Sequence, residues 1–156
     1  MAVAIFGAGC FWGVEEMFRT LDGVSSTSVG YMGGKTSNPT YQQVCTGTSE
    51  HAEVVQVTYE PALIDYETLV ALFFENHNPT QFNRQGPDFG SQYRSVIFYA
   101  DANQQEIATR MKAELEASGK FYKSVVTAIE AAADYWPAED YHQQYLLKRG
   151  MTSCHI

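Results

Sequence analysis

The sequence predicts an α/β (α+β) fold, a two-layer sandwich in which a mixed β-sheet carries helices mainly on one face around a ferredoxin-like core. Two observations support this prediction. Strand-like and helical segments alternate along the 156 residues, and several connections between them are too short for a regular parallel winding. A chain of this length is long enough for a hydrophobic core of its own, so we expect a single domain over residues 1–156.

Five short segments rich in apolar and β-branched residues predict the strands. In chain order they are residues 2–6, 25–31, 52–59, 94–99 and 125–130. The third is the clearest, because Pro61 ends it and apolar residues dominate it. Glycines and Pro39 indicate a loop over residues 33–40.

Four segments predict helices: residues 11–20, 65 to about 76, 101 to 119, and 139–148. Asp65 and Asp101 are typical N-cap residues, and Gly119 is typical of a helix end. Two segments lack periodicity. Residues 77–92 form a long polar loop, which a compact domain usually keeps for function, and residues 149–156 are expected to be a mobile C-terminal tail.

The composition excludes several classes of protein. The formal net charge is -8 and no cluster of Lys or Arg occurs, which argues against nucleic-acid binding. The apolar start of the chain is too short to span a bilayer and lacks the basic residues of a secretory signal. We therefore expect a cytoplasmic protein with no membrane partner. Three scattered cysteines are too few for a disulfide scaffold.

The most informative feature is Cys10, which lies between glycines at the start of the first predicted helix. A helix N-terminus favours the thiolate over the thiol, so Cys10 is a candidate nucleophile. The alternative is a buried cysteine that packs a helix against the sheet. Phe11 and Trp12 favour the first interpretation, because two bulky rings beside a thiol can form the wall of a pocket for an apolar group.

Glu53 is a candidate general acid. The period of two places it on one face of its strand with Val55, Val57 and Tyr59. Burial would favour the neutral carboxyl, which can donate a proton near neutrality. A glutamate at the strand end that faces solvent is the alternative.

Several other polar residues are weaker candidates. Tyr41 and Tyr93 stand at loop junctions and can direct a hydroxyl inward, although tyrosines at such places more often serve packing. Asp88 lies in the long polar loop, which can recognise a peptide backbone. His51 is better explained as a structural residue than as the partner of a protease cysteine. The Cys and His spacing gives no metal site, and we expect no cofactor.

Taken together, the chain resembles the A-type methionine sulfoxide reductases, the peptide-methionine (S)-S-oxide reductase family. The resemblance covers nearly the whole chain, and its motifs are highly specific when they occur in this order. They are Gly9-Cys10-Phe11-Trp12-Gly13, Asn38-Pro39-Thr40-Tyr41, Val44-Cys45-Thr46-Gly47, His51-Ala52-Glu53-Val54-Val55, Asn83-Arg84-Gln85-Gly86, Gln92-Tyr93-Arg94-Ser95 and Tyr141-His142-Gln143-Gln144-Tyr145.

The resemblance implies that the protein reduces the S epimer of methionine sulfoxide in proteins, and free methionine sulfoxide, to methionine. Cys10 would attack the sulfoxide sulfur and become a sulfenic acid. Glu53 would protonate the oxygen, and Tyr41 and Tyr93 would donate hydrogen bonds to it. The substrate would be held by the remaining matched positions, which are Phe11, Trp12 and Asp88.

The same resemblance implies how the enzyme is recycled. Cys154 would form a disulfide with the oxidised Cys10, and thioredoxin would reduce that disulfide in what we expect to be a monomer. Cys45 is assigned to packing, with an auxiliary redox role as the alternative. Two other classes remain open on the residues alone: a thiol peroxidase, which needs no pocket for a methyl group, and a binding module in which Phe11 and Trp12 hold a peptide.

Overall fold

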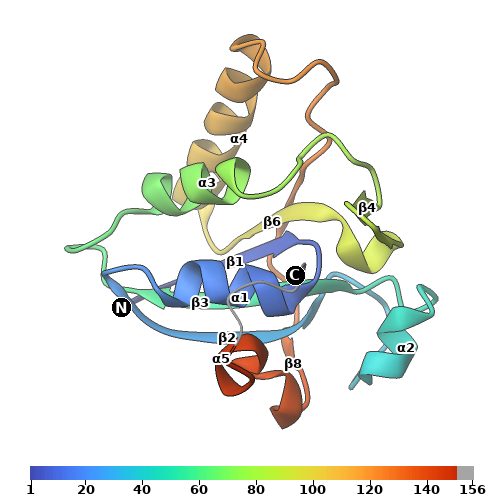
Figure 1. Cartoon of the computed structure of the whole chain (residues 1–156). Helices are drawn as coiled ribbons and strands as arrows, with labels where there is room; N and C mark the ends of the chain where they lie inside the picture. The colour runs from blue at the N-terminus through green and yellow to red at the C-terminus, as the bar shows by residue number, and fades with distance from the viewer. Residues whose placement is uncertain (151–156) are drawn as a thin grey trace.

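Six strands of the computed structural model form one mixed sheet, in the order β7-β6-β1-β3-β2-β8 (Figure 1). The structure describes residues 1–150. The strands are β1 (Ala2–Ala8), β2 (Val24–Met32), β3 (Ala52–Tyr59), β6 (Ser95–Tyr99), β7 (Ala128–Ala131) and β8 (Trp136–Pro137). Within the described residues, β6 and β7 run parallel and the other neighbours in this sheet run antiparallel. The predicted mixed sheet is confirmed.

The helices form the second layer. They are α1 (Phe11–Arg19), α2 (Tyr41–Cys45), α3 (Tyr66–Glu75), α4 (Ala102–Ala117) and α5 (Tyr145–Lys148). The larger hydrophobic core takes alternate residues of the central strands, such as Phe6, Val55 and Ile97, and packs them against Phe18 of α1 and Phe73 of α3. Because side chains alternate across a strand, the other residues form a smaller cluster on the opposite face.

Local capping explains where the helices begin. Asp65 accepts a hydrogen bond from the backbone N–H of Thr68 at 2.8 Å, and Asp101 accepts one from Gln104 at the same distance. Both were predicted N-caps. Gly119, which follows α4, has φ +71°, as expected for a helix end.

Short elements that carry little periodicity were missed. α2 directly follows the predicted loop over residues 33–40 and was not predicted, although Thr40 and Gln43 form a complete capping box. The predicted long loop contains a two-stranded hairpin, β4 (Arg84–Gln85) with β5 (Asp88–Phe89), and the 3-10 helix η1 (Ser91–Tyr93). β7 begins three residues later than predicted, and β8 was not predicted.

The predicted helix over residues 139–148 is wrong. The segment forms the 3-10 helix η2 (Asp140–His142), a break, and then α5. At the break Gln144 has φ +48°, in the left-handed region. Its backbone N–H and side chain bind the carboxylate of Glu15 at 2.8 and 2.7 Å, and the side chain of Gln143 pairs with both backbone groups of Val29. These long-range bonds replace the helical ones.

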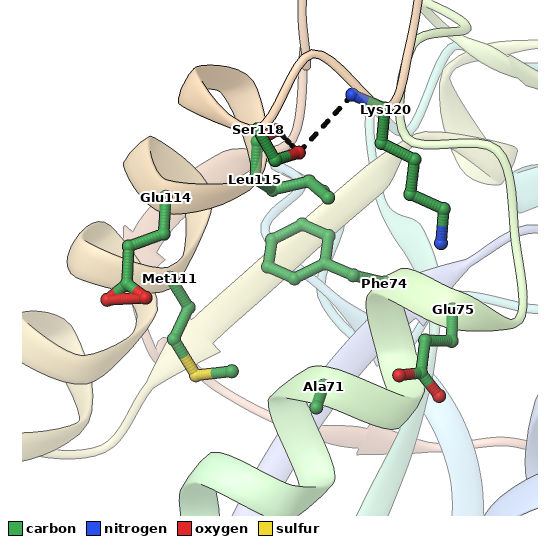
Figure 2. Close-up of a pocket in the computed structure, with 8 residues that line it drawn as sticks. All are labelled: Ala71, Phe74, Glu75, Met111, Glu114, Leu115, Ser118 and Lys120. Carbon is green, nitrogen blue, oxygen red and sulfur yellow. Dashed lines mark hydrogen bonds between the residues drawn. The ribbon is translucent and has the colours of Figure 1, made fainter.

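A hollow of about 260 Å³ lies between α3 and α4. Figure 2 shows Phe74 and Leu115 toward its centre and Glu75, Glu114 and Lys120 around it. This pair of helices lies at the top of Figure 1, away from α2. No helix within residues 1–150 is long and apolar enough to cross a membrane.

A hydrogen-bonded chain links the end of α3 to the sheet through His77. Its Nδ1 donates to the carbonyl of Phe73, and its Nε2 lies 2.7 Å from the hydroxyl of Ser95, which lies 2.7 Å from that of Thr127. Burial lowers the pKa of His77 to about 4, although the bond to the Phe73 carbonyl acts in the opposite direction. The imidazole is therefore neutral at physiological pH.

This environment predicts a loss of stability in acid. The unfolded chain protonates His77 below about pH 6.5 and the folded protein only near pH 4. The free energy of unfolding should therefore fall by about 2 to 3 kcal/mol from this residue between pH 7.5 and 4.5. Urea denaturation at the two pH values measures it. The variant His77→Gln should lose less stability over this range than the parent by that amount; equal losses would contradict the prediction.

Candidate active site

Cys10 lies where β1 ends and α1 begins, and it is the N-cap residue of that helix. The preceding residue must be glycine: Gly9 has φ +101°, and a Cβ atom there would lie 2.9 Å from the side chain of Gln85. The side chain of Cys10 is partly exposed. It thus lies at the positive end of the helix dipole, as the sequence predicted.

Glu53 lies on the helix-facing side of β3 and is 1% exposed. Its Oε1 accepts a hydrogen bond of 3.2 Å from the backbone N–H of Phe11. Because Phe11 is bonded directly to Cys10, this interaction brings the carboxyl and the thiol into one site. The alternative of a glutamate that faces solvent is wrong.

Tyr41 begins α2, and its phenol lies within electrostatic range of the Glu53 carboxyl. Burial raises the pKa of Tyr41 most strongly, followed by a hydrogen bond with the Cys45 thiol and the negative charge of Glu53. The hydroxyl therefore keeps its proton at neutral pH and can donate a hydrogen bond.

Tyr93 ends η1 and belongs to the same group. Burial raises its pKa well above the ordinary value, and the charge of Glu53 makes the next largest contribution. Asp88 and Cys10 act on it in the same direction. Tyr93 is therefore within electrostatic range of three of the other predicted site residues.

The hairpin β4–β5 brings Asp88 to the site. Asp88 pairs across the hairpin with Gln85. The side-chain amide of Gln85 is fixed by the backbone N–H and carbonyl of Asn78, each at 2.9 Å. Since Gln85 also packs on Gly9, the hairpin rests on the turn that precedes Cys10. Asp88 is partly buried.

Phe11 and Trp12 enter a cluster of aromatic rings. Phe11 is fully buried, with its ring centroid 5.7 Å from that of Tyr31 and 6.3 Å from that of Tyr41. Trp12 is partly buried and stacks on Tyr145, with centroids 3.8 Å apart and planes at 8°. The two residues differ in role: Phe11 belongs to the core, whereas Trp12 has an exposed edge.

Two residues of the C-terminal segment contact the site and were not predicted. The Glu139 carboxylate accepts hydrogen bonds from the backbone N–H of Tyr41 at 3.0 Å and from the hydroxyl of Tyr31 at 2.9 Å. Burial acts to raise the pKa of Glu139, but these bonds lower it overall. His142 accepts a hydrogen bond of 2.9 Å from the indole N–H of Trp12. The matched segment that contains His142 was a signal in the sequence, but no role was attached to it.

The other two cysteines and His51 complete the set of candidates. Cys154 falls outside the described residues. Cys45 was assigned to packing, but it is exposed and lies beside Tyr41. His51 is structural, since its ring bonds the backbone of Gly34 and Thr36. Among residues 1–150, no three His, Cys, Asp or Glu side chains are placed to hold a metal ion.

Comparisons with known proteins agree with one another. The sequence profile of a family described as peptide methionine sulfoxide reductase matches residues 2–156. A relative from Methanoculleus marisnigri, named peptide methionine sulfoxide reductase MsrA, is 57% identical over 151 residues, which are 97% of this chain and 92% of that protein.

Solved structures are similar over most of the chain. Mxr1 from Saccharomyces cerevisiae in reduced form has a TM-score of 0.90 and 36% identity, over 96% of this chain and 86% of that one. Mxr1 in complex with Trx2 has a TM-score of 0.65 and 25% identity, over 92% and 84% of the two chains.

Proposed function

The chain belongs to the peptide methionine sulfoxide reductase family, and we propose that it acts on the S epimer of methionine sulfoxide with Cys10 as the nucleophile. Its reaction is the reduction of methionine sulfoxide to methionine. One observation carries the proposed mechanism: the backbone N–H of Phe11 binds Glu53 Oε1, so a buried carboxyl lies beside the residue that bears the thiol. Protein-bound and free methionine sulfoxide are both proposed substrates.

In the first step the Cys10 sulfur attacks the sulfoxide sulfur. The bond between the substrate sulfur and its oxygen breaks, the hydroxyl passes to the Cys10 sulfur, and the bond between the two sulfurs breaks as methionine leaves, so that Cys10 becomes a sulfenic acid. Oxygen departs from sulfur readily only when it is protonated or strongly hydrogen-bonded. Glu53 supplies that proton, because burial at 1% exposure favours the neutral carboxylic acid over the carboxylate.

Tyr41 and Tyr93 assist the same oxygen. Both phenols keep their protons at neutral pH, since burial raises their pKa values. A hydroxyl fixed in advance stabilises developing negative charge without reorganisation of solvent. Glu139 holds the start of α2, and hence Tyr41, by accepting its backbone N–H.

The substrate is held by groups on either side of Cys10. Trp12 offers an apolar face to the terminal methyl group, with the buried ring of Phe11 behind it. Asp88, on the hairpin that rests on Gly9, accepts a hydrogen bond from the substrate backbone.

A second thiol restores the enzyme. The Cys154 sulfur attacks the sulfenic sulfur of Cys10, a disulfide forms, and water is released. An external dithiol then reduces the disulfide. We propose thioredoxin for this role, because the similar yeast protein Mxr1 has been solved in complex with Trx2.

The substrate test uses peptides that contain either epimer of methionine sulfoxide. The S epimer should be reduced at least a hundredfold faster than the R epimer or hydrogen peroxide at equal concentration, because only the S epimer can place its methyl group on Trp12 and its oxygen on Glu53. Cys10→Ser should have no measurable turnover. Comparable rates with hydrogen peroxide would favour a thiol peroxidase, and an active Cys10→Ser variant would exclude the proposed nucleophile.

The proton donor is tested by Glu53→Gln. The glutamine side chain has the shape of glutamate but cannot act as an acid, so the rate of the first turnover should fall by a factor of about 10² to 10⁴. Stopped-flow measurement of methionine formed without reductant gives this rate. Glu16→Gln is the control, because the Glu16 carboxylate on α1 pairs with Arg19 instead. A first turnover as fast as that of the parent in Glu53→Gln would refute the acid role.

The recycling step is tested by Cys154→Ser. One methionine per enzyme should still form, while turnover driven by thioredoxin should stop. Cys45→Ser is the control and should cycle normally. If Cys154→Ser cycles at the parental rate, the resolving thiol is not Cys154. If Cys45→Ser fails to cycle, Cys45 takes part in recycling.

A further inference from the structure

Trp12 is held by two different kinds of contact. Its indole stacks on Tyr145 with centroids 3.8 Å apart, and the guanidinium of Arg149 lies 4.3 Å from the centroid of the Tyr145 ring. Stacking of nearly parallel rings fixes the plane of the indole but permits sliding and rotation within that plane. The hydrogen bond from the indole N–H to His142 Nδ1, at 2.9 Å, removes this freedom.

His142 can accept this bond only when it is neutral. Nδ1 must carry a lone pair, so the single ring proton is on Nε2. Within residues 1–150, Nε2 is buried and has no hydrogen-bond partner. A protonated ring would carry an N–H donor at each nitrogen. The Nδ1–H would face the indole N–H, which is also a donor, and the Nε2–H would have no acceptor among the described residues. The site therefore disfavours the imidazolium.

The surroundings of His142 are mostly uncharged rings. Phe11 and Trp12 of α1, Tyr41 of α2 and the neighbouring Tyr141 have centroids 4.1 to 5.6 Å from that of His142. Glu139, at the start of the same segment, is the charged group whose field favours the imidazolium. Burial outweighs it, and the pKa of His142 is lowered overall.

The position of His142 is itself fixed. Its residue is 1% exposed, and the next two side chains anchor the segment: Gln143 to Val29 and Gln144 to Glu15. The imidazole is thus a rigid acceptor, not a side chain that follows Trp12.

We propose that His142 is a positioning residue for the substrate pocket: in its neutral form it fixes the in-plane orientation of Trp12, and its protonation releases the indole and weakens substrate binding. This inference rests on the proposed role of Trp12 against the methyl group of the substrate. His142 in this role leaves the chemistry at Cys10 unchanged. Its loss therefore changes the half-saturating concentration of substrate, and not the maximal rate of the first turnover.

The coupling is tested first without substrate. Trp136→Phe leaves Trp12 as the single tryptophan, because the chain has two. Its fluorescence should change in acid with a midpoint below pH 6.5, as the hydrogen bond breaks and a cation forms beside the indole. Adding His142→Asn should abolish this transition, because Asn can offer an acceptor but does not titrate. Adding His77→Gln instead, which removes a different buried imidazole, should leave the fluorescence transition unchanged. A transition that survives His142→Asn, or its absence in Trp136→Phe, would overturn the proposal.

Substrate binding is tested in the first turnover without reductant, over a range of concentrations of a methionine sulfoxide peptide. His142→Leu should raise the half-saturating concentration roughly tenfold at pH 7.5, since it leaves the indole N–H without an acceptor, with an unchanged maximal rate. His142→Asn should have the parental half-saturating concentration at pH 7.5. In this variant the half-saturating concentration should not rise in acid, as it should in the parent. An equal loss of maximal rate in both variants would indicate a structural role only and overturn the proposal. If the fluorescence results hold while the half-saturating concentration stays constant, His142 orients Trp12 but the indole does not bind the substrate.

Discussion

The hydrogen bond between the Phe11 N–H and Glu53 is the interaction on which the site depends. It connects the first turn of α1 to β3, two elements that are 42 residues apart in the chain. A carboxyl that is 1% exposed needs such a partner, because a buried polar group without one is costly. The helix start also leaves backbone N–H groups without partners inside the helix. One bond serves both needs and holds the carboxyl next to Cys10.

Residues 139–144 hold two further side chains of the site in place. Glu139 holds Tyr41, and His142 holds Trp12. Both can do so because the chain does not form a regular helix here: Gln143 and Gln144 direct their hydrogen bonds to β2 and Glu15. The left-handed conformation of Gln144 has a cost, which these bonds offset. The site is therefore assembled from the start of α1 and from residues 139–144, which are far apart in the chain.

Much of the fold could be predicted because burial leaves a period in the sequence. The two-residue period placed Glu53 on the same face as Val55 and Val57, and the structure confirms that face. The N-caps Asp65 and Asp101 were readable for a similar reason, since a cap binds a backbone group only three residues away. The hairpin β4–β5 was missed because two paired residues are too few to show a period.

The sequence by itself determined the turn at Gly9, the thiol at the start of a helix and the strand face that carries Glu53. Each depends on neighbours within a few residues, so local sterics and periodicity are sufficient. Only the tertiary structure decided that Tyr41 and Tyr93 approach that carboxyl, that Cys45 is exposed, and that His142 holds Trp12. These contacts join segments up to 130 residues apart. Their geometry is set by how the layers pack, and packing leaves no periodic mark on either segment alone.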